Sequence, residues 1–198
     1  MSSTDTAAAP VQEVIARRPK RADAQRNYDS LIEAARAAFA ESGTQTSLEE
    51  IARRAGVGIG TLYRNFPNRQ DLLEAVYVGE VEALCQSAGE LGALEPFEAL
   101  AAWLHRFCGY LATKQALAHE LLEYLDRDSP LFRGCRSAFY EAGAPLLERA
   151  QQAGVARADV DFDEVIQMAS GITKIPSADP AQIGRILDVA IDGLRYRA

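Results

Sequence analysis

The residues whose types and spacing best fit a chemical task lie close together, at residues 59–65, and the task is contact with nucleic acid. Arg64 can donate two hydrogen bonds to guanine O6 and N7, and Ile59 can contact the methyl group of thymine. Thr61 and Tyr63 carry hydroxyl groups that can bond to phosphate oxygens, which positions a protein on DNA without reading its sequence. The stretch therefore combines base-reading and phosphate-binding side chains.

Residues on either side of this stretch can extend the contacts. Thr46 and Ser47 stand at the start of a preceding short helix, where their hydroxyl groups suit phosphate oxygens. Asn68 and Arg69 open a later helix, where backbone N–H groups and a cation together attract a phosphate. Asn65 keeps hydrogen-bond donors on the outward face of the helix that carries Arg64.

Two short helices and a tight turn must hold these side chains in place. Ser47 and Glu50 form a capping-box pattern, in which Ser47 accepts from the N–H of Glu50 and the carboxylate of Glu50 reaches back. Gly56 can adopt the positive φ of a tight turn. Leu62 and Phe66, four residues apart, face a small apolar core and fix the second helix. With the longer apolar helix that precedes them, these elements form a helix-turn-helix.

This ordered string of residues resembles the tetracycline-repressor (TetR) family of bacterial transcription regulators. The residues that carry the resemblance are Leu31-Ile32-x-x-Ala35-x-x-x-Phe39-x-x-x-Gly43, Ile51-Ala52-x-x-Ala55-Gly56-Val57, Gly60-Thr61-Leu62-Tyr63-x-x-Phe66 and Leu72. The resemblance implies a three-helix DNA-binding module, followed by a helical body that binds a ligand and forms a dimer.

The resemblance also gives roles to individual residues. It implies base contacts from Ile59, Gly60 and Arg64, and phosphate contacts from Thr61, Tyr63 and Arg69. Three positions depart from the family pattern. Gly58 stands where a capping serine is common and so loses a side-chain cap. Asn65 replaces the usual histidine or tyrosine and Arg69 the usual lysine, and both keep hydrogen-bond donors.

Charge is distributed unevenly along the 198 residues, whose formal net charge is −7. Residues 17–69 hold ten Lys and Arg against six Asp and Glu, whereas residues 79–198 hold eleven against eighteen. A basic N-terminal part followed by an acidic C-terminal part is typical of a nucleic-acid-binding domain joined to a separate regulatory domain. Chance variation of surface charge is the alternative.

We expect three parts along the chain. Residues 1–24 lack an apolar period and carry the run Arg17-Arg18-Pro19-Lys20-Arg21, which predicts a disordered basic arm. The arm either threads an adjacent minor groove or is a solvated tail that adds nonspecific attraction, and we favour the tail. Residues 25–68 form the predicted helix-turn-helix domain, and residues 69–198 form the predicted ligand-sensing and dimerisation domain.

Helical spacing of apolar residues continues through the rest of the chain, and no segment alternates as a strand, so the predicted fold class is all-α. Separate helices are predicted over residues 97–111 and 117–125. A later helix opens at Ser129-Pro130, and Pro145 should kink or split it. Asp179-Pro180 opens a last helix that runs to about residue 195.

The last helices carry an apolar arc that is too wide for one side of the body to cover. They could build an intermolecular four-helix bundle, which agrees with the dimer that the resemblance implies. The alternative is a terminal helix packed on its own domain. The predicted dimer residues are Val165, Ala169, Ile172, Ile183, Ile186, Leu187, Ala190, Ile191 and Leu194.

Side chains from three helices could converge on a pocket for a small, mostly apolar molecule. Aromatic residues at helical spacing also form ordinary core, which is the alternative reading. The candidate ligand-binding residues are Trp103, Phe107, Tyr110, His119, Glu123, Tyr124, Phe132, Phe139 and Tyr140.

Other classes of protein are disfavoured. The sequence contains no Gly-rich phosphate loop after a strand, no HExxH and no GxSxG, so we expect no enzyme. No apolar run approaches the ~18 residues of a membrane span, and no secretory signal opens the chain. Three widely spaced cysteines disfavour disulfides and suit a reducing cytoplasm. Neither His105 nor His119 has a carboxylate or second histidine at ligand spacing, so we expect no metal and no cofactor.

The expected partners are double-stranded DNA, a second copy of the chain and an unidentified small-molecule effector. Because repression is the family habit, we expect a dimeric repressor that binds a palindromic operator and is released by the effector. A dimeric DNA-binding regulator without a small-molecule ligand is the alternative.

Overall fold

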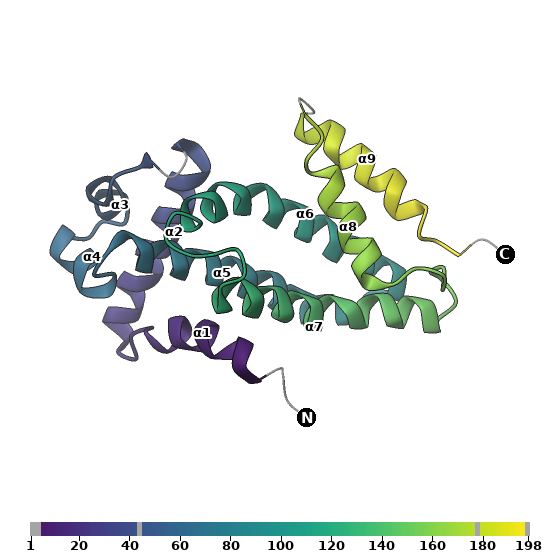
Figure 1. Cartoon of the computed structure of the whole chain (residues 1–198), viewed down its shortest axis with the longest axis horizontal. Helices are drawn as coiled ribbons and strands as arrows, with labels where there is room; N and C mark the ends of the chain where they lie inside the picture. The colour runs from purple at the N-terminus through teal and green to yellow at the C-terminus, as the bar shows by residue number, and fades with distance from the viewer. Residues whose placement is uncertain (1–4, 43–44, 177–178, 197–198) are drawn as a thin grey trace. The chain divides into compact units, whose positions relative to one another are not determined.

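The computed structural model describes residues 5–42, 45–176 and 179–196, and the regular structure in these ranges is helical (Figure 1). The helices are α1 (Asp5–Ala16), α2 (Ala22–Ser42), α3 (Leu48–Arg54), α4 (Ile59–Asn65), α5 (Arg69–Glu90), the 3-10 turn η2 (Leu91–Ala93), α6 (Pro96–Leu121), α7 (Pro130–Gln152), α8 (Phe162–Ile172) and α9 (Pro180–Asp192). Within these ranges the one β feature is an isolated bridge between Ala156 and Arg195. The predicted all-α class is confirmed. None of the helices in the described ranges is both long and apolar enough to cross a bilayer.

Two compact units divide the chain. The first contains Met1–Glu80 and Thr113–Arg136, and the second contains Val81–Ala112 and Ser137–Ala198. The division falls within helices, since α5, α6 and α7 each contribute a part to both units, whereas the domain boundary predicted from the sequence lies between residues 68 and 69. The 22 residues of α5 span about 33 Å. A helix of that length can serve more than one core.

Helices α2, α3 and α4 pack on one another in the first unit. The buried residues of α2 recur with helical spacing and face this small core; they are Tyr28, Leu31, Ala35, Ala38 and Phe39. Between α3 and α4, Gly56 has a φ of 68°, as predicted for the tight turn. Gly43, the last residue of the first part of the string, lies outside the described residues.

The helix starts predicted from local signals are present. The N–H of Glu50 donates to Ser47 Oγ over 3.2 Å, and the N–H of Asp71 donates to Asn68 Oδ1 over 2.9 Å. Asp179 accepts from the N–H of Gln182 and caps α9. The carboxylate of Glu50, however, accepts hydrogen bonds from the two arginines that end α3 rather than forming the predicted return bond to the cap.

The described residues from Asp5 onward differ from the predicted disordered arm. Asp5–Ala16 forms α1, and Val14 is only 4% exposed. Arg17, just after α1, donates to Asp71 Oδ1 over 2.6 Å. Burial of Val11 and Val14, three residues apart on one helical face, stabilises a helix that is too short to reveal itself by periodicity.

Two helices are longer than the sequence predicted. Pro96–Leu121 is one continuous α6 of 26 residues, not two helices. Of the two outcomes predicted for Pro145, a kink or a split, the split does not occur, because α7 continues through this residue. Phe139 before the proline and Leu146 after it are both buried, so packing on either side offsets the hydrogen bond that proline cannot donate.

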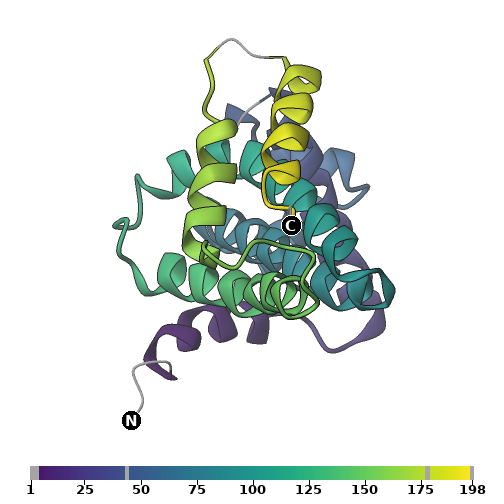
Figure 2. The ribbon, with the colours of Figure 1, turned by 90° about the vertical axis from the view of Figure 1, so that its right-hand side faces the viewer.

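In the second unit, α8 and α9 contact each other and run side by side (Figure 2). Gly154, which follows α7, has a φ of 69°, a conformation typical of the residue just after the end of a helix. Asp161 opens α8 with a complete capping box, in which its side chain and that of Glu164 each accept from the other's backbone N–H.

Candidate nucleic-acid interface

The exposed side of α4 carries the side chains predicted to read DNA. Ile59 is 38% exposed and Tyr63 is 46% exposed, and Arg64 also faces solvent. On the opposite side Leu62 is fully buried and Phe66 packs on Tyr28 with ring centroids 5.1 Å apart. Burial of one side therefore fixes which residues the other side presents.

Two glycines open this surface at the start of α4. A Cβ added at Gly58 or at Gly60 would meet no other atom within 4 Å. Neither glycine is therefore needed for packing within the chain. Gly58 caps α4 without a side-chain hydrogen bond, and its backbone carbonyl accepts from the N–H groups of Thr61 and Leu62. The exposed glycines leave space for a ligand to approach the backbone closely.

Polar side chains on α4 interact with one another. Arg64 Nη2 donates to Thr61 Oγ1 over 2.9 Å, and Asn65 Nδ2 donates to the carbonyl of Thr61 over 2.8 Å. The first bond orients an exposed guanidinium on a stable helix. The second engages the half-buried Asn65 amide with its own helix rather than presenting it outward as predicted.

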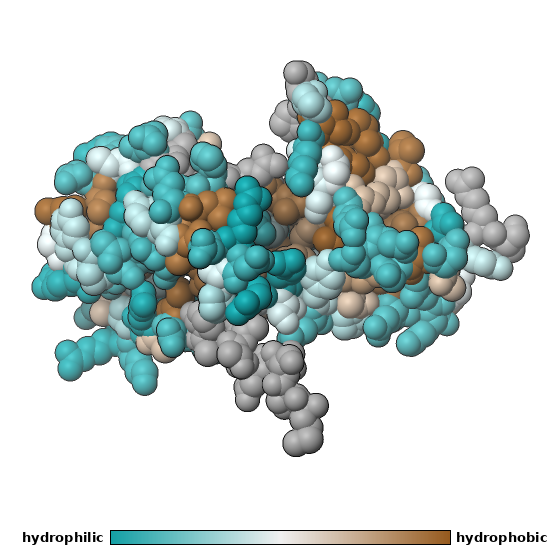
Figure 3. Space-filling view, in the orientation of Figure 1, coloured by the Kyte–Doolittle hydropathy of each residue, from teal (hydrophilic) through white to brown (hydrophobic). Residues whose placement is uncertain are grey.

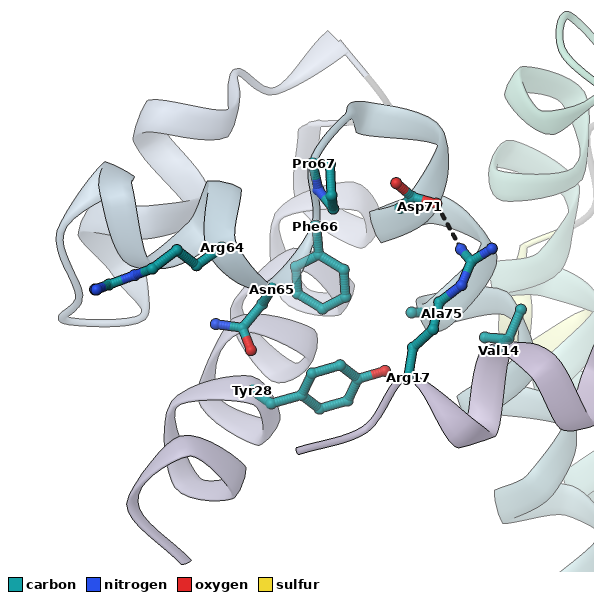
Figure 4. A pocket seen from close by; sticks show the side chains of 9 residues that line it. All are labelled: Val14, Arg17, Tyr28, Arg64, Asn65, Phe66, Pro67, Asp71 and Ala75. Carbon is teal, nitrogen blue, oxygen red and sulfur yellow. Dashed lines mark hydrogen bonds and ion pairs between the residues drawn. The ribbon is translucent and has the colours of Figure 1, made fainter. Parts of the chain in front are cut away.

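A groove of about 380 Å³ lies behind α4 within the first unit (Figure 4). It is lined by Val14, Arg17, Tyr28, Arg64, Asn65, Phe66, Pro67, Asp71 and Ala75. The guanidinium of Arg64 points away from the rings of Tyr28 and Phe66, whereas Arg17 reaches Asp71 across the groove (Figure 4). The side chain of Arg64 is thus directed to the outer surface.

Two residues predicted to bind phosphate lie inward. Thr46 is 9% exposed and its hydroxyl donates to the carbonyl of Ala38 over 3.5 Å. Arg69 donates from Nη1 to the carbonyl of Thr46 over 2.9 Å and from Nε to Glu120 Oε1 over 2.5 Å. These bonds replace the outward orientation that was expected. Ser47, next to Thr46, remains exposed.

Acidic side chains partly balance the arginines of α3. Hydrogen bonds from Arg53 and Arg54 lower the pKa of Glu50 to about 2. Arg53 keeps 73% of its side chain exposed, and Arg54 pairs with Glu41 Oε2 at 2.6 Å as well. The positive charge of this helix is therefore held in fixed ion pairs.

The candidate pocket residues fall into both compact units. Trp103, Phe107 and Phe139 form an aromatic cluster with Phe162 in the second unit, at centroid distances of 5.5 to 5.8 Å. In the same unit Tyr110 packs on Phe107, and Tyr140 packs on Phe162 and donates its hydroxyl to Asp163. The cluster is buried, since Trp103 has no exposed surface and Phe139 has 5%.

The other four candidates belong to the first unit. Phe132 packs on Tyr77 at 5.3 Å, edge to face. His119, Glu123 and Tyr124 are exposed. The nine residues are thus divided between the two units, and the proposed pocket stays a prediction.

Gly143 is a residue of the aromatic cluster that the sequence did not reveal. A Cβ at this position of α7 would lie 2.5 Å from Phe162 Cζ and 2.5 Å from Trp103 Cη2. Only glycine lets both rings approach α7 this closely. A glycine among the apolar residues of a predicted helix is a signal that another group packs closely against that helix. The sequence does not indicate which aromatic rings do so.

The predicted dimer residues divide by exposure within the single chain. Val165, Ala169, Leu187 and other members are buried against their own unit, whereas Ile183, Ile186 and Ala190 of α9 are half-buried. Val189, which was not predicted, is 74% exposed. Figure 3 shows an apolar surface over this part of the second unit.

Chemistry other than binding has little support in the described residues. Cys85, Cys108 and Cys135 are free, and burial raises the pKa of Cys85 and of Cys108 to about 11, which keeps both as unreactive thiols. No group of three metal-binding side chains occurs in the part of the chain that the structure describes. His105 Nε2 does lie 3.0 Å from Asp188 Oδ1, a partner in space that sequence spacing did not reveal.

The arrangement of α2, α3, the Gly56 turn and α4 defines a helix-turn-helix DNA-binding module. A family model described as "Bacterial regulatory proteins, tetR family" matches residues 31–76, which contain this module. A second model, "Transcriptional regulator SbtR-like, C-terminal domain", matches residues 95–196, more than half of the chain. The chain belongs to the TetR family of DNA-binding transcriptional regulators, which are not enzymes.

Known proteins agree with this assignment. The chain is 40% identical to a TetR transcriptional regulator from Streptomyces coelicolor, with a TM-score of 0.76, and the match covers 86% of this chain and 99% of that one. A TetR regulatory protein from Mycobacterium vanbaalenii is 37% identical, with a TM-score of 0.74 and coverage of 90% and 100%. An HTH-type transcriptional regulator from Staphylococcus aureus is 42% identical over 53 residues, which are 26% of this chain and 29% of that relative.

Proposed function

We propose that the protein is a repressor that binds a palindromic operator as a dimer and is released by a small, mostly apolar molecule. The observation that carries the DNA-reading part is the exposed side of α4, where Ile59, Tyr63 and Arg64 stand opposite the buried Leu62. A recognition helix anchored in this way can enter a major groove, and a dimer places two such helices about one DNA turn apart.

Selection of bound sequences from a random DNA pool tests this proposal. We expect a palindromic consensus whose half-sites are separated by about 10 base pairs, centre to centre. A single, unpaired half-site would contradict the dimer, and a pool without any enriched sequence would contradict sequence-specific binding. A reporter gene placed behind the selected operator then distinguishes repression from activation by the sign of the change.

The apolar surface of α9 supports the dimer. Val189 is 74% exposed, and the half-buried Ile183, Ile186 and Ala190 lie on the same helix. An apolar helix surface of this kind is covered in a four-helix bundle formed by the last two helices of each protomer.

The aromatic cluster of the second unit supports an apolar effector, but its close packing favours a second candidate function. Trp103 and Phe107 stack with centroids 5.6 Å apart, and Gly143 brings α7 against the same rings. A filled cluster needs no ligand to complete it. The second candidate is therefore a dimeric regulator that responds to its own abundance or to a partner protein rather than to a small molecule.

The fluorescence of Trp103 separates the two candidates, because it is the one tryptophan of the chain. A panel of small aromatic and aliphatic compounds is titrated against the protein with and without operator DNA. For the effector-released repressor we expect a compound that changes Trp103 emission and also weakens operator binding. If every compound that changes the emission left operator affinity untouched, the regulator without an effector would be supported instead.

A further inference from the structure

Arg69 is the first residue of α5, and its contacts join three separate segments of the first unit. Nε donates to Glu120 Oε1 of α6 over 2.5 Å, and Nη1 donates to the carbonyl of Thr46 over 2.9 Å. The guanidinium also lies over the ring of Phe39, 5.7 Å from its centroid, near the end of α2. One side chain therefore links α6 to the segment that leads into α3.

Glu120 depends strongly on this arginine. Its side chain is 11% exposed, one carboxylate oxygen binds Arg69, and the other is buried without a hydrogen-bond partner. An ionised carboxylate in such a place is unfavourable unless a cation stays beside it. Moving Arg69 to a DNA phosphate would break the ion pair and the bond to Thr46, and would leave a buried charge unpaired.

We propose that Arg69 is a positioning residue rather than a phosphate ligand. It fixes the start of α3 to α6 through Glu120, so that the DNA affinity of the reading module depends on where α6 holds this carboxylate. The linkage is consistent with the planar guanidinium, which can donate in two directions at once, whereas the ammonium of a lysine acts as a point charge. This inference rests on the proposed DNA-binding function and names a residue of α6 on which that function depends.

Operator affinity of the full-length protein, measured over a range of salt concentrations, distinguishes the two roles. If Arg69 positions α3, Glu120→Gln and Arg69→Gln each weaken operator binding about tenfold, and the double variant is no weaker than either single one. The slope of log affinity against log salt then stays unchanged. If Arg69 binds phosphate, Arg69→Gln reduces the steepness of that slope by about 0.9 for each phosphate it no longer neutralises, and Glu120→Gln leaves affinity unchanged or raises it.

Conservative variants and a matched control keep the test independent of folding. Arg69→Lys retains a cation beside Glu120 but not the planar fork of the guanidinium, so we expect it to bind more weakly than the native protein and more tightly than Arg69→Gln. Glu120→Asp is the milder change should Glu120→Gln fail to fold, and we expect several-fold weaker binding from it. Glu98→Gln removes the carboxylate beside Arg195, an exposed ion pair of the second unit, and should leave affinity unchanged.

Hydrogen exchange adds a readout that general destabilisation would not produce. In Glu120→Gln we expect faster exchange over Leu48–Arg54 and no change over Phe162–Ile172. Full operator affinity in Arg69→Lys or in folded Glu120→Gln would overturn the positioning role while leaving DNA binding by the native protein intact. Failure of the native protein itself to bind any selected sequence would instead overturn the proposed function.

Discussion

At the scale of single residues, exposure separates the side chains that can reach DNA from those that hold the module together. Tyr63 and Arg64 extend from a helix whose other side is buried, while Thr46 and Arg69 are engaged within the first unit. All four are polar residues of the same short region. Their sequence positions alone assign them similar roles, and only their partners in the fold distinguish them.

Arg64 and Tyr63 should contribute to DNA binding in different ways. Arg64→Ala removes a side chain that can hydrogen-bond a guanine edge, so we expect a loss of about 1–3 kcal/mol and a relaxed preference at one base pair of each half-site. Tyr63→Phe removes a hydroxyl suited to phosphate, so we expect weaker binding to all sequences by a similar factor. Selection from a random DNA pool checks both variants. An unchanged consensus for Arg64→Ala would show that another residue reads that base.

At the scale of helices, short-range signals explain which elements were predicted correctly. A cap such as Asn68 needs a partner only three residues away, and the Gly56 turn needs one residue with positive φ. The features that were wrong or missed depend on distant residues. Arg69 and Glu120 are 51 positions apart, and α1 is held by the burial of Val14. The hydrophobic period of a helix is recognised over a short stretch of sequence, so it cannot reveal a contact between residues that lie far apart in the chain.

The cap of α3 should be important for both stability and DNA binding. Ser47→Ala removes the bond to the N–H of Glu50, so we expect a loss of about 1 kcal/mol in the free energy of unfolding. Denaturant unfolding measures this loss, and operator affinity should fall with it because α3 supports α4. Ser30→Ala is the matched control: it removes an exposed hydroxyl inside α2 and should leave both quantities nearly unchanged. Equal effects of the two variants would contradict a specific capping role.

Gly143 should be the glycine of the second unit least tolerant of a methyl group. In Gly143→Ala the new Cβ meets Phe162 and Trp103 at 2.5 Å, so we expect a loss of about 1–3 kcal/mol in the free energy of unfolding. Gly109→Ala, on an exposed position of α6 with open space around it, should be neutral or stabilising by up to about 1 kcal/mol. Chemical denaturation of both variants checks the contrast. A neutral Gly143→Ala would mean that the rings move apart easily, as an effector pocket would require.

At the scale of the whole molecule, the proposed dimer determines how a helix-turn-helix module becomes an operator-specific regulator. One α4 contacts a single half-site, whereas two linked copies bind both half-sites and gain affinity without new contacts. Residues that join the copies therefore affect DNA binding even though they touch no base. The single chain already indicates which substitutions can test this. Leu187 is 2% exposed within its own protomer, so a charge there would disturb folding as well as association.

Val189 offers the cleaner test, because it is 74% exposed in the single chain. Val189→Asp should leave the fold of each protomer intact but place a carboxylate from each copy in the proposed α9 interface, which would weaken association. Sedimentation should then detect monomers, and affinity for the full palindrome should fall towards that for a half-site. Val155→Asp, at a position that is 38% exposed and outside α9, is the control and should remain dimeric. A native protein that sediments as a monomer, or a Val189→Asp variant that remains a dimer with full operator affinity, would rule out this surface as the interface.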